Sequence, residues 1–234
     1  MLRRTRSCAV VAALAATFSL VGGPTHAAAL TTAGVGWKLT TQLGVTSASP
    51  SKTYTITFAT ETLRKRYTPL LGPAVAQVNA AGLHLKLGGV EPVNPAKCGP
   101  AYHVQITELY RPLGRAGFSQ GMPCPNPPKG LGIGGIVAYD SEYWTGYPIA
   151  TYKLRNTVVH EPLHVLGLDH PNADLNRDGK LADYECVATS YGNTPIMCSP
   201  NGGYKTTATM GKLTGYDTNG LRALLANARA QGIR

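Results

Sequence analysis

Alternating apolar and polar residues predict a β-rich first half of the chain. The segments TYTITFA (53–59) and YHVQITELY (102–110) alternate, and the first is rich in β-branched side chains. Successive side chains of a strand point to opposite faces, so this alternation is typical of a sheet with one buried face. Together with shorter apolar runs, the pattern predicts strands at 53–59, 83–90, 102–110 and 135–144, with a short edge strand near 117–120.

Helical patterns mark three other segments, at 62–81, 149–166 and 218–231. In the first, Pro69 and Gly72–Pro73 predict a break, because proline has no N–H to donate within a helix. In the last, three leucines fall on one face of the helix. The order of these elements predicts an α+β fold, with a mixed, mostly parallel twisted sheet on which helices pack.

The N-terminus predicts export from the cell. A basic start, MLRRTRS, precedes the apolar run CAVVAALAATFSLV, and small residues suited to cleavage follow. Residues 1–29 are therefore expected to be a signal peptide, and the mature protein is expected to be extracellular. The apolar run is too short to span a membrane, and no other stretch is long and apolar enough. Residues 30–50, rich in Thr, Gly and Ser, are expected to form a flexible segment before a single domain at 51–234.

The segment HEPLHVLGLDH carries the strongest chemical signal in the chain. His160 and His164 lie four residues apart, so both share one face of a helix. Gly167 lets the chain leave that helix in a left-handed conformation, which can bring His170 back as a third ligand. Three histidine nitrogens leave one tetrahedral position open, the arrangement of a catalytic zinc ion. Glu161, about 100° round the helix from His160, is expected to be the general base rather than a ligand.

The spacing HExxHxxGxxH resembles that of the metzincin zinc peptidases. The resemblance implies a methionine turn under the metal, for which Met197 in NTPIMCSP is the candidate. It also implies that the antiparallel edge strand of the sheet binds extended substrate. The domain is then expected to have an upper lobe at 51–167 and a smaller lower lobe at 168–234, which ends in a helix. Within the clan the chain is most similar to matrixins, and next to small secreted actinobacterial metallopeptidases.

Pro162 departs from the metzincin pattern. It lies inside the expected zinc helix, removes one helix N–H and crowds the carbonyl of Val158, at a cost of about 3 kcal/mol. We expect a kinked but continuous helix, and a degraded catalytic site is the alternative.

The segment DLNRDGKLADYE (174–185) fits the calcium loop of an EF-hand. Gly179 stands at the sixth position, where that loop turns sharply. Five of the twelve acidic residues of the chain fall between Asp169 and Glu185, and without a cation they would repel one another. A solvated acidic turn is the alternative. The expected Ca²⁺ ligands are Asp174, Asn176, Asp178, Lys180 through its backbone carbonyl, and Glu185.

Cysteine count and charge add two further expectations. Cleavage of the signal leaves four cysteines, which predicts two disulfides in an exported chain. Of three possible pairings, proximity favours Cys98–Cys124 and Cys186–Cys198. Cleavage also removes three of the 22 basic residues and none of the 12 acidic ones, which leaves a formal charge of +7. These basic residues are scattered, with no interleaved aromatic residues, which argues against nucleic acid as a partner.

Taken together, these features predict a secreted, monomeric endopeptidase with Zn²⁺ for chemistry and Ca²⁺ for stability, acting on a protein or peptide substrate. Glu161 would take a proton from the zinc-bound water and pass it to the leaving amine. Some metzincins stabilise the oxyanion with a tyrosine after the turn methionine; Ser199 stands there, which leaves Tyr191 and Tyr204 as candidates. Two alternatives are a secreted zinc- and calcium-binding protein whose catalysis Pro162 impairs, and a cell-wall hydrolase that cleaves a peptide crosslink.

Overall fold

The structure is a computed structural model that describes residues 29–124 and 127–234. The expected signal peptide lies, except for its last residue, outside the described residues. Within the described ranges, no helix is long and apolar enough to cross a membrane.

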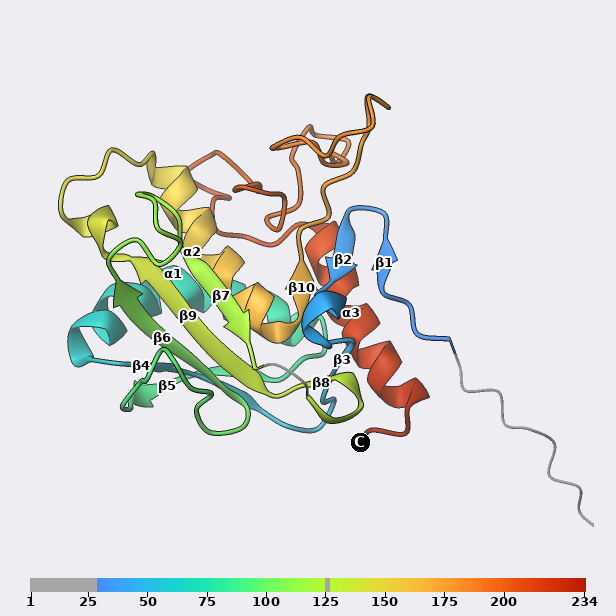
Figure 1. The fold of residues 1–234 in the computed structure, drawn as a ribbon, viewed down its shortest axis with the longest axis horizontal. Helices are drawn as coiled ribbons and strands as arrows, with labels where there is room; N and C mark the ends of the chain where they lie inside the picture. The colour runs from blue at the N-terminus through green and yellow to red at the C-terminus, as the bar shows by residue number, and fades with distance from the viewer. Residues whose placement is uncertain (1–28, 125–126) are drawn as a thin grey trace, which may run out of the picture.

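A five-stranded sheet with the order β5-β4-β6-β9-β7 forms the centre of the fold (Figure 1). Four strands are parallel, and β7 pairs antiparallel with β9 at one edge. This confirms the mixed, mostly parallel sheet, and it places the edge strand a few residues later than expected. The strands are β4 (Tyr54–Phe58), β5 (Leu85–Val90), β6 (His103–Leu109), β7 (Gln120–Pro123) and β9 (Gly134–Asp140).

The β9 strand is shorter than the segment 135–144 predicts. It ends at Asp140, whose carboxylate accepts a hydrogen bond from the backbone N–H of Glu142 and starts a 3-10 helix at Ser141–Trp144. The same carboxylate accepts from the backbone N–H groups of Arg111 and Gly117. The buried carboxylate thus accepts three backbone hydrogen bonds from residues that follow β6 and β9. These contacts hold the chain after Asp140 in a turn rather than in a longer strand.

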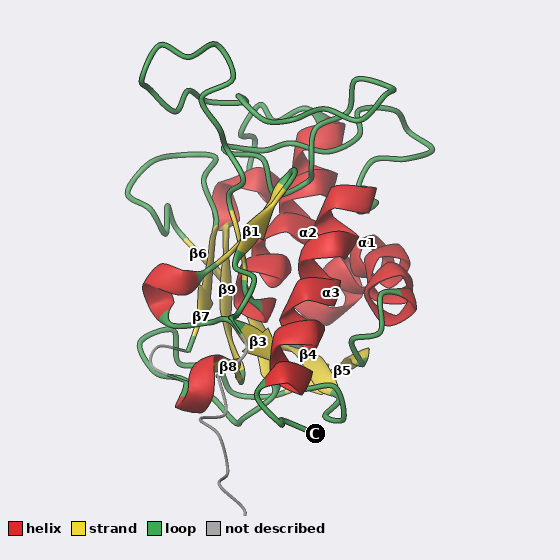
Figure 2. Ribbon diagram, turned by 90° about the vertical axis from the view of Figure 1, so that its right-hand side faces the viewer, coloured by secondary structure: helices red, strands yellow, loops and turns green. Residues whose placement is uncertain are grey.

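Three helices occur among the described residues: α1 (Glu61–Ala80), α2 (Thr151–Leu166) and α3 (Gly215–Ala230). The first two contact each other and the sheet, and Figure 2 shows the three helices on the same side of the sheet. The core between these layers is made of fully buried aromatic and aliphatic side chains, among them Tyr54, Phe58, Tyr67, Ile106 and Leu163.

The expected break in the first helix is wrong, because α1 continues through Pro69 and Pro73. These prolines lie four residues apart on the exposed face of the helix. A helix carbonyl that loses its N–H partner on that face can be hydrated, so the missing hydrogen bonds cost less there than inside the core.

The segment 30–50 also differs from the flexible segment expected. It forms three short strands and a 3-10 helix at Thr41–Leu43, and it buries Leu39, Val45 and Ala48 completely. Strand β2 (Trp37–Leu39) pairs with β1 (Ala33–Gly34) and with β10 (Leu168–Asp169). Strand β3 (Ser47–Ala48) pairs in parallel with β8 (Leu131–Gly132), which follows a second 3-10 helix at Pro128–Gly130. The segment is held by partners more than eighty residues away, which local composition does not reveal.

Residues 170–214 connect β10 to α3 without any helix or strand, and they form the group of orange loops at the top of Figure 1. Cys186 and Cys198 of these loops form one disulfide, and Cys98 and Cys124 near the sheet form the other. Both pairings expected from sequence proximity are confirmed.

Candidate metal centre

Three histidines converge beside the C-terminal half of α2. Nε2 of His170 lies 3.1 Å from Nε2 of His160 and 3.0 Å from Nε2 of His164. Nitrogens about 2.0–2.1 Å from one tetrahedral zinc ion lie roughly 3.4 Å apart, so three donors at this spacing fit a shared cation. Among the described residues, these three form the one group of His, Cys, Asp or Glu side chains that could hold a metal ion.

Hydrogen bonds to backbone carbonyls orient two of the three imidazoles. Nδ1 of His160 lies 2.7 Å from the carbonyl oxygen of Ile196, and Nδ1 of His164 lies 2.8 Å from that of Leu168. A carbonyl can only accept, so each Nδ1 carries the proton and each Nε2 presents a lone pair. Lone pairs that face one another at 3 Å repel unless a proton or a cation lies between them. Metal-bound histidines usually donate their other ring N–H to a backbone carbonyl or carboxylate, as these two do.

Burial keeps the histidines neutral, as metal binding requires. Desolvation lowers the pKa of His160 well below its ordinary value, and the neighbouring histidines lower it further. Desolvation likewise lowers the pKa of His164 to about 3 and lowers that of His170. A buried imidazole is disfavoured as a cation because the low-dielectric surroundings replace its hydration.

The N-terminal segment holds His170, the third histidine, in place. After α2, Gly167 adopts φ 114°, as expected for a left-handed helix end, and the chain enters β10. There Asp169 accepts a hydrogen bond from the backbone N–H of His170 and forms an ion pair with Lys38 of β2 at 3.0 Å. The hydroxyl of Thr40 donates to the carbonyl of Leu168, which also accepts from His164. Residues 37–40, more than 120 positions upstream, therefore brace the turn that carries His170.

Pro162 is accommodated within a continuous helix α2. In a regular helix the N–H of residue 162 would donate to the carbonyl of Val158, and proline has no such group. Instead, the buried hydroxyl of Tyr139 on β9 donates to that carbonyl at 2.6 Å. The freed acceptor is thus satisfied from the sheet, and both His160 and His164 remain on the same side of the helix in contact distance of His170.

Glu161 lies in the floor of the cleft that contains the histidines. The cleft has a volume of about 590 Å³, and β7 forms part of its wall. Burial raises the pKa of the Glu161 carboxyl to about 8, and a hydrogen bond from the backbone of Gly121 on β7 opposes this shift. A Cβ at Gly121 would come within 2.2 Å of the Glu161 carbonyl oxygen, so the absence of a side chain lets β7 lie directly against α2.

A scan against known protein families and a search of curated proteins find no match to this chain. Function is therefore inferred from the geometry of the site itself.

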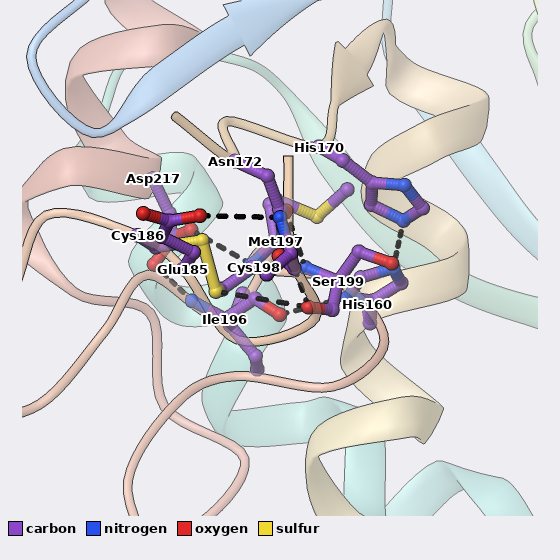
Figure 3. Close-up of a disulfide and its surroundings, with 11 residues drawn as sticks. His160, His170, Asn172, Glu185, Cys186, Ile196, Met197, Cys198, Ser199 and Asp217 are labelled. Atoms are coloured by element: carbon purple, nitrogen blue, oxygen red, sulfur yellow. Dashed lines mark hydrogen bonds between the residues drawn. A yellow bond between two sulfur atoms is a disulfide. The ribbon is translucent and has the colours of Figure 1, made fainter. Parts of the chain in front are cut away.

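The turn that carries Met197 lies beside His160 (Figure 3). Met197 is buried, and its N–H and that of Ile196 both donate to the carboxylate of Asp217 in α3. The disulfide of Cys198 adjoins this turn. Asp217 was not among the residues singled out by sequence, although its place three residues after Thr214 suits a capping box, which the structure contains.

The loop 174–185 has the sharp turn expected at Gly179, where φ is 82°. Its acidic groups are occupied by backbone donors: Asp174 accepts from the N–H groups of Asp178 and Gly179, and Glu185 accepts from three others. The described carboxylates of this loop do not form a group comparable to the three histidines. The calcium ligands at Asp174, Asn176, Asp178, Lys180 and Glu185 therefore stay a prediction.

The cleft also contains aromatic residues that the sequence analysis did not select. The cleft is lined by Ser199 and by four tyrosines, Tyr143, Tyr147, Tyr152 and Tyr184. Tyr191 and Tyr204, the candidates from the sequence, are not among its lining residues. Tyr184 reaches the cleft because its N–H donates to the carbonyl of Ser199, two residues beyond Met197. No local pattern marks a tyrosine as cleft-lining, since that depends on how the long loop folds back.

Proposed function

We propose that this chain is a secreted zinc endopeptidase of the metzincin type. The observation that carries the proposal is the convergence of three neutral histidine Nε2 donors next to a buried glutamate, in a cleft walled by an antiparallel edge strand. His160, His164 and His170 would hold the zinc ion. A zinc ion bound by three protein ligands supplies an acidified water, with a pKa of about 7, and polarises a substrate carbonyl.

Glu161 moves the proton in this proposal. Its carboxylate accepts a proton from the attacking water and returns it to the leaving amine. Burial raises the pKa of the Glu161 carboxyl, and a zinc cation held beside it would lower that pKa again, which favours the ionised form that accepts the proton. β7 is the edge strand of the sheet and lines the cleft, where an extended substrate would pair with its outer edge, which supports a peptide rather than a small molecule as substrate.

The accommodation of Pro162 favours a working enzyme over a degraded site. The hydroxyl of Tyr139 replaces the missing helix N–H, so the proline leaves no buried acceptor unsatisfied at this point. Because α2 includes both His160 and His164, their four-residue spacing places the two imidazoles on the same face of the helix.

The test is zinc content and proteolysis of the purified mature protein. Wild type is expected to hold one zinc and to cleave unfolded casein, and a chelator should stop cleavage. Glu161→Ala is expected to keep the zinc and to lose about 10²–10⁴-fold in turnover, the usual contribution of a general base. His164→Ala should lose the zinc itself, measured by elemental analysis. Full activity of Glu161→Ala would remove this residue from the mechanism, and no zinc-dependent cleavage by wild type would refute the proposal.

A further inference from the structure

The cleft continues beyond the metal site into a second hollow of about 450 Å³. Tyr152, Lys153, Tyr184 and Asn201 line both, so the two spaces adjoin. None of the three histidines lines the second hollow. In a bound peptide, the scissile bond would lie at the histidines. The second hollow would then receive side chains from only one side of that bond.

The charged residues that line the second hollow are basic, and the main cleft has basic residues as well. Lys153 and Lys205 line the second hollow, and Arg115 lines the main cleft, where its guanidinium stacks over Phe118 at 3.6 Å. Apart from Glu161, the acidic residue of the lining is Asp183. The ion pairs found among the described residues involve none of the three basic side chains. Their charges are therefore available to a ligand.

The wall between the two hollows is fixed rather than loose. The side-chain amide of Asn201 donates to the carbonyl of Lys153 at 2.9 Å and to the hydroxyl of Thr157, which ties the loop after Met197 to the first turns of α2. The Oδ1 atom of Asn201 is buried and has no hydrogen-bond partner among the described residues. Helix α2 has no acidic residue in its first turn, so the positive end of its dipole is not offset there.

We propose that the substrates of this site are acidic peptides, with Asp or Glu side chains on one side of the scissile bond seated near Lys153 and Lys205. This inference rests on the proposed function and deepens it. A carboxylate that meets an exposed lysine typically gains about threefold in affinity, so the two lysines together are expected to give a preference of roughly tenfold over a basic peptide. The preference should shrink in high salt, because exposed charges are screened within about 10 Å at 0.1 M.

The experiment measures binding without turnover. Zinc-loaded Glu161→Ala protein is titrated into two fluorescein-labelled twelve-residue peptides that are identical except for glutamate or lysine at the outer positions. Anisotropy is read at about 50 mM and 500 mM NaCl, where screening differs strongly. We expect the glutamate peptide to bind about tenfold more tightly at low salt. The Lys153→Glu/Lys205→Glu pair in the same background should abolish or reverse that preference.

A charge-matched control separates a local effect from the net charge of the protein. Lys65 and Lys86 are exposed and line neither hollow, so Lys65→Glu/Lys86→Glu makes the same change in total charge elsewhere. This control is expected to keep the preference. If it loses the preference as fully as the Lys153/Lys205 pair does, or if the starting protein binds both peptides equally, the inference is overturned. Lys205→Glu alone, in an exposed loop, serves if the double variant does not fold, which circular dichroism shows.

The outcomes for the inference and for the proposed function can be told apart. Wild type that cleaves casein while its Glu161→Ala form shows no charge preference would refute the acidic substrate and keep the peptidase. Wild type that cleaves nothing would refute the peptidase, and the binding comparison would still decide whether the hollow selects acidic ligands. Where cleavage occurs, mass spectrometry of products from a peptide library should show Asp and Glu enriched on one side of the cut only.

Discussion

The hydrogen bond between Tyr139 and Val158 offers a sharp test of how the protein tolerates Pro162. Tyr139→Phe removes the hydroxyl and leaves the carbonyl of Val158 buried without a donor, because Pro162 has none to give. An unsatisfied buried acceptor costs about 1–3 kcal/mol. For a domain of this size, each kcal/mol lowers the melting temperature by about 2–4 °C, so a decrease of roughly 2–12 °C is expected.

The same reasoning predicts coupling between Tyr139 and Pro162. With Pro162→Ala the helix regains an N–H for Val158, so Tyr139→Phe should then cost less than it does in wild type. A difference of roughly 0.5–1.5 kcal/mol between the two costs is expected, the net contribution of one hydrogen bond. The single Pro162→Ala change is expected to bring little stability, since the carbonyl already has a donor. From the sequence alone, replacement of Pro162 would be expected to recover the cost of about 3 kcal/mol and to stabilise the protein. The hydrogen bond from Tyr139 removes that expectation.

The assay is a double-mutant cycle by urea denaturation. Free energies of unfolding are measured for wild type, both single variants and the double variant, with the disulfides intact and zinc in excess. Repetition with a chelator checks that the coupling does not come from changed zinc affinity. Independent sites show additive effects within about 0.3 kcal/mol. If Tyr139→Phe destabilises wild type and Pro162→Ala equally within that margin, Tyr139 and Pro162 are not coupled through the carbonyl of Val158.

Two further predictions concern the loops around the metal. Lys38→Met breaks the ion pair with Asp169 that braces His170. Because this ion pair is half exposed, zinc binding is expected to weaken by about two- to fivefold in competition with a chelator, with exposed Lys52→Met as control. Equal zinc affinity in both variants would contradict the bracing role. If the loop 174–185 binds calcium, millimolar calcium should raise the melting temperature of the zinc-loaded protein, and Asp178→Ala should abolish that rise; a melting temperature that does not respond to calcium would dismiss the site.

The histidines of the candidate metal centre could be predicted from the sequence because their positions depend on local geometry. His164 follows His160 by four positions in the helix, and a glycine three residues later turns the chain, so the positions of the three histidines follow from one short segment. The strands were recognisable for the same reason, since alternation is a local consequence of a half-buried sheet. The disulfide pairings also followed from short separations along the chain.

Other features depended on contacts between distant residues. The sequence around Pro162 predicts a lost hydrogen bond, but the replacement donor is Tyr139, on a strand that only the tertiary fold brings beside α2. The composition of 30–50 suggests a loose segment, yet Lys38 and Thr40 brace the turn at His170 from more than 120 residues away. Local patterns report the conformation that a segment prefers, whereas the partner that satisfies a buried carbonyl or carboxylate is set by packing. The chain alone therefore identified the three histidines of the candidate metal centre, and the tertiary structure decided what holds them in place and which charges line the cleft.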